Sequence, residues 1–137
     1  MIVLKNKVEN KQAIIIGLLV IYVFVILSET IFFRKPTDGE HLQLELFWSY
    51  KVLNIEGKQM LANVLMFIPF GFLLSLLDKR ICMVMLCGFL FSCSIEILQF
   101  VFKIGLCELD DVFHNTLGTL IGLLIGKWII ANYRKKN

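Results

Sequence analysis

Long apolar stretches alternate with short polar breaks along the whole chain. Four runs consist mainly of hydrophobic residues, and each is about as long as an α-helix must be to cross the apolar core of a bilayer. Their approximate bounds are residues 13–33, 58–77, 81–102 and 110–131. The pattern predicts an all-α, polytopic integral membrane protein, with four transmembrane helices in an antiparallel bundle and one domain over residues 1–137.

The first run could also be a secretory signal peptide, because it follows a polar start with several lysines. No cleavage site of small residues follows the run, so we expect an uncleaved transmembrane helix. The end of the run carries Glu29. This carboxylate either reaches the membrane interface or belongs to the group of polar residues described below.

The segment 34–57 is the longest part of the chain outside the four runs. Pro36 and Gly39 indicate irregular structure near its start. Its leucines, together with Trp48 and Tyr50, are too apolar for a free loop, so we expect an extracellular segment in the interface plane. His41 is expected to be solvated.

Small and kinking residues mark the second and fourth runs. Pro69 removes a backbone hydrogen bond and predicts a kink in the second helix, and Gly71 permits close approach of a neighbouring helix. In the fourth run, glycine recurs every four residues, a spacing that lets membrane helices touch through their backbones. We expect a structural role for these five residues: Pro69, Gly71, Gly118, Gly122 and Gly126.

The composition supports a membrane protein and argues against several other classes. Hydrophobic residues make up 58% of the chain and charged residues 18%, with a formal net charge of +3. The basic residues cluster at the ends of the apolar runs, which is typical of topology signals rather than of nucleic-acid binding. The four cysteines lack the spacing of a zinc or redox site, so no disulfide, metal or other cofactor is expected.

Lysine and arginine are distributed unequally between the two sides that four spans would define. The side with both termini and the turn at 78–80 holds nine of them, and the other side holds five. The positive-inside rule therefore predicts that both termini lie in the cytoplasm.

Polar residues inside the apolar runs are the strongest indication of function. Ionisable groups at membrane depth are costly and usually face a protein interior or a wet cavity. With the predicted topology, they fall in the outer half of the membrane on different helices. We predict a shared binding pocket open to the outer leaflet, formed by Asn63, Glu96, Gln99, Asp111 and Asn115. Glu96 is expected to be protonated or hydrogen-bonded to Asn63 or Asn115.

Three ordered motifs resemble the VanZ-like family of small bacterial membrane proteins. They are Asn63-x3-Phe67-x-Pro69-x-Gly71, Ser94-x-Glu96-x2-Gln99 and Asp110-Asp111-x3-Asn115-x2-Gly118. The resemblance covers about residues 58–126. It implies a cell-envelope role in the bacterial cytoplasmic membrane, linked to resistance to the lipoglycopeptide teicoplanin. The family often has an arginine before the aspartates; this chain has none there, and Lys103 is a candidate substitute.

Three classes of function fit these observations. The first is a non-enzymatic protein that binds a lipoglycopeptide or a lipid-linked wall precursor. The second is an intramembrane enzyme acting on an envelope lipid, with Glu96 as general base and Asp110 or Asp111 as partner acid. The third is a structural subunit, in which the polar residues only lock the bundle.

The enzyme is the less favoured of the first two classes. The sequence has no serine or cysteine beside a base, no glycine-rich phosphate loop and no zinc-protease motif. Asp110, His114 and Glu96 could share a divalent metal, but this ligand set is thin, so no metal site is predicted. Ligand identity and oligomeric state stay open.

Overall fold

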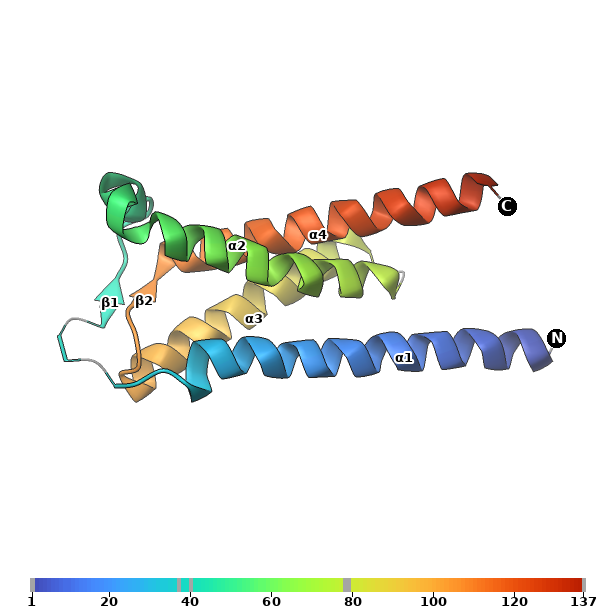
Figure 1. Ribbon diagram of the computed structural model, residues 1–137, viewed down its shortest axis with the longest axis horizontal. Coiled ribbons are helices and arrows are strands. Elements are labelled where there is room, and N and C mark those ends of the chain that lie inside the picture. The colour runs from blue at the N-terminus through green and yellow to red at the C-terminus, as the bar shows by residue number, and fades with distance from the viewer. Residues whose placement is uncertain (1, 37, 40, 78–79, 137) are drawn as a thin grey trace.

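Four long helices run along the same axis in alternating directions, and both ends of the chain lie at one end of the molecule (Figure 1). The computed structural model describes residues 2–36, 38–39, 41–77 and 80–136. The helices are α1 (Ile2–Leu27), α2 (Leu53–Leu76), α3 (Ile81–Phe102) and α4 (Leu109–Lys136). Each contains a segment long and apolar enough to cross a membrane. The prediction of an all-α membrane protein with four spans is therefore confirmed.

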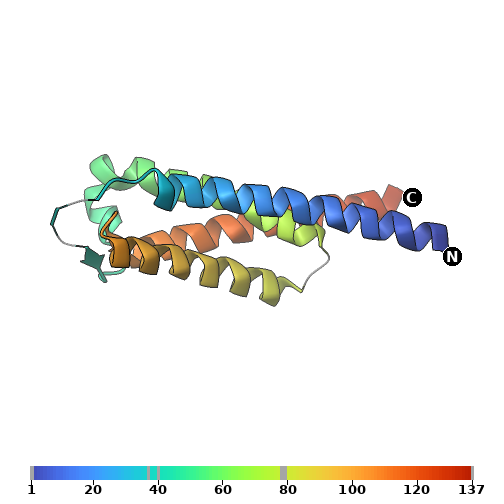
Figure 2. The ribbon, with the colours of Figure 1, turned by 90° about the horizontal axis from the view of Figure 1, so that it is seen from below.

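The connecting segments carry the remaining structure, at the end of the molecule opposite the termini (Figures 1 and 2). A π-helix, η1 (Ser28–Phe32), continues α1, and a 3-10 helix, η2 (Trp48–Val52), leads into α2. Strands β1 (Leu42–Gln43) and β2 (Cys107–Glu108) pair in parallel. Within the predicted turn between α2 and α3, Asp78 and Lys79 lie outside the described residues.

Helices α2 and α4 make the closest contact in the bundle. A side chain at Gly122 would collide with the carbonyl oxygen of Ile68, and one at Gly118 would collide with that of Val64. From the other helix, Gly71 lies equally close to the backbone of Thr119. Glycine is required at these points because a Cβ atom would separate the two backbones.

Helix α1 packs against α2 and α3 through apolar side chains. The fully buried group consists of Ile26, Phe67, Phe70 and Ile95. The Tyr22 hydroxyl donates a hydrogen bond of 2.8 Å to the Met66 carbonyl. This contact lies about one turn before Pro69. Proline has no backbone N–H, so the Leu65 carbonyl, four residues earlier, accepts no hydrogen bond from it within the helix.

The outward surface of the helices is apolar, as contact with lipid requires. Ile21, Leu61, Ile97 and Leu124 are each more than half exposed. At the end of the bundle opposite the termini, the buried side chains are instead mostly polar, as expected where polar groups avoid lipid by facing the protein interior.

Candidate functional site

Residues 41–52, which we call the strap, fold back over the end of the bundle and attach to the first turn of α4. Asp110 is fully buried. Its carboxylate accepts hydrogen bonds from the Phe47 amide, the Ser49 amide at 2.9 Å and the Ser49 hydroxyl at 2.6 Å. These three donors occupy both carboxylate oxygens, so Asp110 holds the strap in place.

Further contacts from the strap reach α4 and the segment before it. The Trp48 indole donates to the Glu108 carboxylate at 3.2 Å, and the Tyr50 hydroxyl lies 3.1 Å from Nε2 of His114. The half-buried His41 contacts the Gly105 carbonyl at 3.3 Å. His41 is therefore only partly solvated, and the polar atoms of Trp48 and Tyr50 also bond to protein groups. The position of Trp48 and Tyr50 at headgroup level stays a prediction.

Under the strap, three helices and two connecting segments bring charged and amide side chains together. The Glu108 amide donates a hydrogen bond of 2.9 Å to Glu96, and Gln59 donates one of 3.3 Å to Asp111. The carboxylates of Glu96, Glu108 and Asp111 interact electrostatically with one another. We call this group the polar cluster: Arg34, Gln59, Asn63, Glu96, Glu108 and Asp111.

Arg34 supplies the positive charge of the polar cluster. Its guanidinium interacts electrostatically with both Glu96 and Asp111. One of its nitrogens lies 2.8 Å from the position that a Cβ atom at Gly105 would occupy. The proposed substitute, Lys103, is exposed at the end of α3. The basic partner therefore comes from the end of the first span and not from the segment before the aspartates.

The widened helical turn η1 gives α1 an additional point of attachment. Gln99 donates a hydrogen bond of 3.0 Å to the Thr30 carbonyl within η1. Turns of this kind are often found at functional sites. Arg34 follows η1 by two residues, so the contact between Gln99 and Thr30 also fixes the chain next to Arg34.

Glu108 lies outside the membrane-spanning segments and has an unusual acidity. Burial, followed by the negative charge of Asp111, raises its pKa from 4.5 to about 7. The Trp48 hydrogen bond opposes part of this change because it favours the charged carboxylate. Glu108 can therefore gain or lose a proton near neutral pH.

Several buried polar atoms near the polar cluster have no hydrogen-bond partner among the residues that the structure describes. Nδ2 of Asn63 lies near the Asp111 carboxylate without adopting hydrogen-bond geometry. Nδ1 of His114, Oε1 of Gln99 and Oδ1 of Asn115 are likewise unpartnered. Each of these residues is at least nine-tenths buried, so the atoms are unused donors and acceptors in the interior.

Asn115 lies one turn deeper than Asp111 along α4. Its side-chain nitrogen donates to the Ser92 hydroxyl at 2.9 Å, and its backbone carbonyl accepts from the Thr119 hydroxyl at 3.0 Å. The hydrogen bond to Glu96 comes from the Glu108 backbone amide. The expectation that Asn63 or Asn115 would provide it is wrong.

Two of the alternatives raised by the sequence are not supported. Glu29 is exposed, so it belongs to the surface and not to the polar cluster. Among the described residues, no three histidine, cysteine, aspartate or glutamate side chains are placed to share a metal ion.

Sequence reasoning missed the contributions of Arg34, Ser49, Gln59 and Glu108. A signal existed for Gln59, since it lies four residues before Asn63 and so on the same face of the helix. Arg34 and Glu108 lie at the ends of apolar runs, where charged residues are common and carry no further signal. Ser49 carries no local signal, because its partner is 61 residues away.

Comparison with known proteins shows the family to which this chain belongs. The family model described as VanZ/LLP1 matches residues 13–130. The chain belongs to the VanZ/LLP1 family. This VanZ/LLP1 match includes the whole strap and every residue of the polar cluster.

A curated relative, Protein VanZ of Enterococcus faecium, is 41% identical over 68 residues. The aligned stretch covers 48% of this chain and 42% of that relative, so less than half of the relative's length is matched. No solved structure matches this VanZ/LLP1 chain.

Proposed function

We propose that this VanZ/LLP1 protein lies in the bacterial cytoplasmic membrane and lowers susceptibility to teicoplanin-type lipoglycopeptides. In this proposal the polar cluster binds an amphipathic ligand at the outer leaflet. The ligand is the lipoglycopeptide itself or a lipid-linked wall precursor. The observation that carries the proposal is a set of buried, unpartnered polar atoms beside three carboxylates within a membrane bundle.

The charge of the polar cluster indicates which part of such a ligand it would contact. Three carboxyl groups lie near one guanidinium, so the cluster offers many hydrogen-bonding oxygens and only one cation for a phosphate group. Sugar hydroxyls, amides and amines would instead find acceptors in Glu96, Asp111 and the free oxygens of Gln99 and Asn115. The proposed contact is therefore with the sugar or peptide portion of the ligand.

The test is the substitution Glu96→Gln. Glutamine can still accept the hydrogen bond from the Glu108 amide, so folding should be retained. Replacing the carboxyl removes one hydrogen bond to the ligand and should weaken binding up to about tenfold. Teicoplanin binding to the protein in nanodiscs and teicoplanin susceptibility of cells would both be measured, with the exposed Glu29→Gln as the matched control.

If Glu96→Gln binds teicoplanin and protects cells as the unchanged chain does, the charge of Glu96 has no role in this function. If Glu96→Gln instead fails to fold and Glu29→Gln does not, the polar cluster only locks the bundle.

An acid–base enzyme is the second candidate, and the interaction between Glu96 and Asp111 favours it. Adjacent carboxylates hold a proton with different affinities, which suits proton transfer. Asp110 is a poor partner for such a reaction because the strap occupies its oxygens. Chemical change of a lipid-linked precursor, followed by mass spectrometry and lost in Glu96→Gln, would favour the enzyme over simple binding.

The orientation in this proposal places the strap outside the cell and both termini in the cytoplasm. In intact cells and a cysteine-free background, a membrane-impermeant thiol reagent should label Asp38→Cys and leave Lys135→Cys unlabelled. Both positions are exposed. The opposite labelling would move the polar cluster to the inner leaflet and exclude an outer-leaflet ligand.

A further inference from the structure

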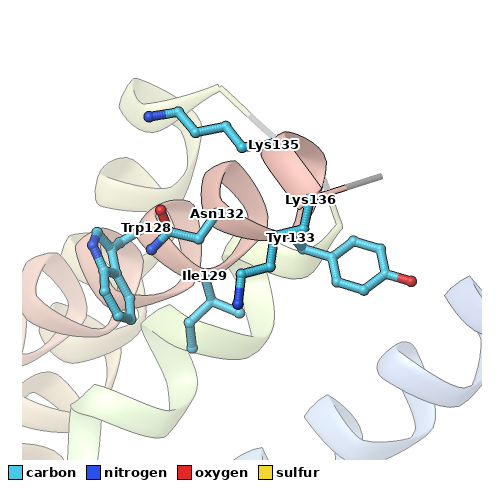
Figure 3. Close-up of a pocket in the computed structure, with 6 residues that line it drawn as sticks. All are labelled: Trp128, Ile129, Asn132, Tyr133, Lys135 and Lys136. Carbon is cyan, nitrogen blue, oxygen red and sulfur yellow. The ribbon is translucent and has the colours of Figure 1, made fainter.

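A hollow of about 510 Å³ lies at the end of α4, at the opposite end of the molecule from the polar cluster (Figure 3). Its residues come from the last turns of α4: Trp128, Ile129, Asn132, Tyr133, Lys135 and Lys136. Figure 3 shows Trp128, Asn132 and Lys135 on one side of the helix end, whereas the Tyr133 ring points away on the other. None of these six described residues is acidic.

The length of α4 places this hollow at the membrane interface. Helix α4 has 28 residues and, at about 1.5 Å per residue, a length of about 42 Å. The apolar core of a bilayer is about 30 Å thick, or roughly 20 helical residues. If the core begins near Leu109, it therefore ends near Trp128, and Asn132, Lys135 and Lys136 extend into the headgroup region.

The residues that line the hollow change from apolar to cationic along α4, toward its C-terminal end. Trp128 is 67% exposed, and tryptophan favours the boundary between acyl chains and headgroups. One and two turns further along the same face follow an amide, Asn132, and a cation, Lys135. Lys136 adds a second cation on the adjacent face. A molecule that fits must be apolar at one end and anionic at the other.

A neighbouring hollow of about 470 Å³ strengthens the basic character of this end. It shares Ile129 and Tyr133 with the first hollow and adds Lys11 of α1 and Arg134. Basic residues immediately beyond a transmembrane helix attract anionic lipids, and each contributes about 1 kcal/mol near the membrane surface.

We propose that the hollow at Trp128, Asn132, Lys135 and Lys136 binds the headgroup of an anionic phospholipid. Trp128 and Ile129 cover the first part of the acyl chains, Asn132 donates to the ester or glycerol oxygens, and Lys135 and Lys136 supply the positive charge that attracts the phosphate from two sides (Figure 3). This site is independent of the polar cluster and of the ligand proposed for it.

The experiment places the full chain in phosphatidylcholine nanodiscs that contain a small fraction of a lipid brominated on its acyl chains. Bromine quenches tryptophan fluorescence on contact. The brominated lipid is either phosphatidylglycerol or phosphatidylcholine, at equal concentration. The chain has two tryptophans, so Trp128→Phe supplies the signal of Trp48 for subtraction.

Trp128 should be quenched more strongly by the brominated phosphatidylglycerol. The double variant Lys135→Gln/Lys136→Gln should lose this preference, by about fivefold for each lysine. The matched control, Lys35→Gln/Lys103→Gln, removes two exposed charges at the opposite end and should leave the preference unchanged. Equal quenching of Trp128 by the two lipids would overturn the proposal. An equal loss of preference in the control variant would also overturn the proposal, because the preference would then depend on the total charge of the protein and not on Lys135 and Lys136.

Discussion

At the loop end of the bundle, α4 is connected to the rest of the chain by charged and amide side chains, whereas from Gly118 onward it contacts α2 backbone to backbone. Membrane helices have no hydrophobic force between them, since lipid is as apolar as leucine. The glycine contact relies on close packing, and its buried hydroxyls, on Ser75 and Thr119, bond to backbone carbonyls of their own helices. The loop end relies on hydrogen bonds, and its unpartnered atoms are what a ligand could use.

This comparison separates a part of the bundle suited to stability from a part suited to recognition. It predicts that substitutions in the glycine contact should impair the whole fold, whereas those at the loop end should have local effects.

Gly122→Leu should have the largest effect. A Cβ atom there would collide with the Ile68 carbonyl and lie 2.7 Å from the Phe72 nitrogen. Forcing the two backbones apart should cost about 3 kcal/mol or more. Thermal unfolding in detergent measures the loss. Gly17→Leu is the matched control, because no atom lies within 4 Å of its Cβ position. Similar melting of the two variants would contradict the close contact between α2 and α4.

Asp110→Ala should release the strap and leave the bundle folded. Three donors would lose their acceptor, at a local cost of about 3 kcal/mol. Hydrogen exchange over residues 41–52 should accelerate roughly a hundredfold, while exchange in the middle of α2 stays slow. The control Glu45→Ala changes an exposed ion pair that should contribute little. Accelerated exchange throughout α2 would show that the two regions are not separable.

Glu108→Gln should change how stability depends on pH. The folded chain holds this proton more tightly than the unfolded chain, so the contribution of Glu108 to stability falls as pH rises from about 4.5 to about 7. Above pH 7 the variant should be more stable by about 2 kcal/mol, allowing for partial solvation of the carboxylate. Below pH 4.5 the two chains should be equal. Unfolding followed by tryptophan fluorescence at several pH values measures this, and parallel profiles would contradict the shifted pKa.

Lys103→Gly should have the smallest effect and a stabilising one. Lys103 ends α3 with φ of 53°, a left-handed conformation that glycine adopts without strain. Relief of the left-handed strain is offset in part by the greater freedom of glycine in the unfolded chain, so the gain should be about 0.5–1 kcal/mol. Lys103→Ala is the control, since it removes the charge but keeps the strain. Equal stability of the two variants would show that charge and not conformation governs this position.

The same comparison explains which features could be predicted from the sequence. The four spans and the glycine spacing depend on neighbours within one or two helical turns, so local periodicity indicates them. Local sequence also indicates Glu96 and Asp111 as candidate site residues, because a carboxylate is rare in an apolar run. The strap depends instead on pairs such as Ser49 with Asp110, separated by 61 residues. No local pattern encodes such a pair.

Arg34 shows a second reason for incomplete prediction. The topology rule alone accounts for a basic residue at the end of a span, so the sequence gives no sign of the electrostatic interaction of Arg34 with the carboxylates. Its position depends on the widened turn η1 and on the bond from Gln99 to Thr30. Neither is visible in hydrophobic periodicity.

The long separation between the strap and its partners also has a consequence for biosynthesis. Residues 41–52 are made early, but Asp110, Glu108 and His114 emerge only after α2 and α3 have been translated. Until then the Phe47 and Ser49 amides lack the carboxylate that accepts their hydrogen bonds. The strap can therefore attach only after α4 has been made. A chain interrupted before α4 would leave residues 41–52 unattached and open to proteases.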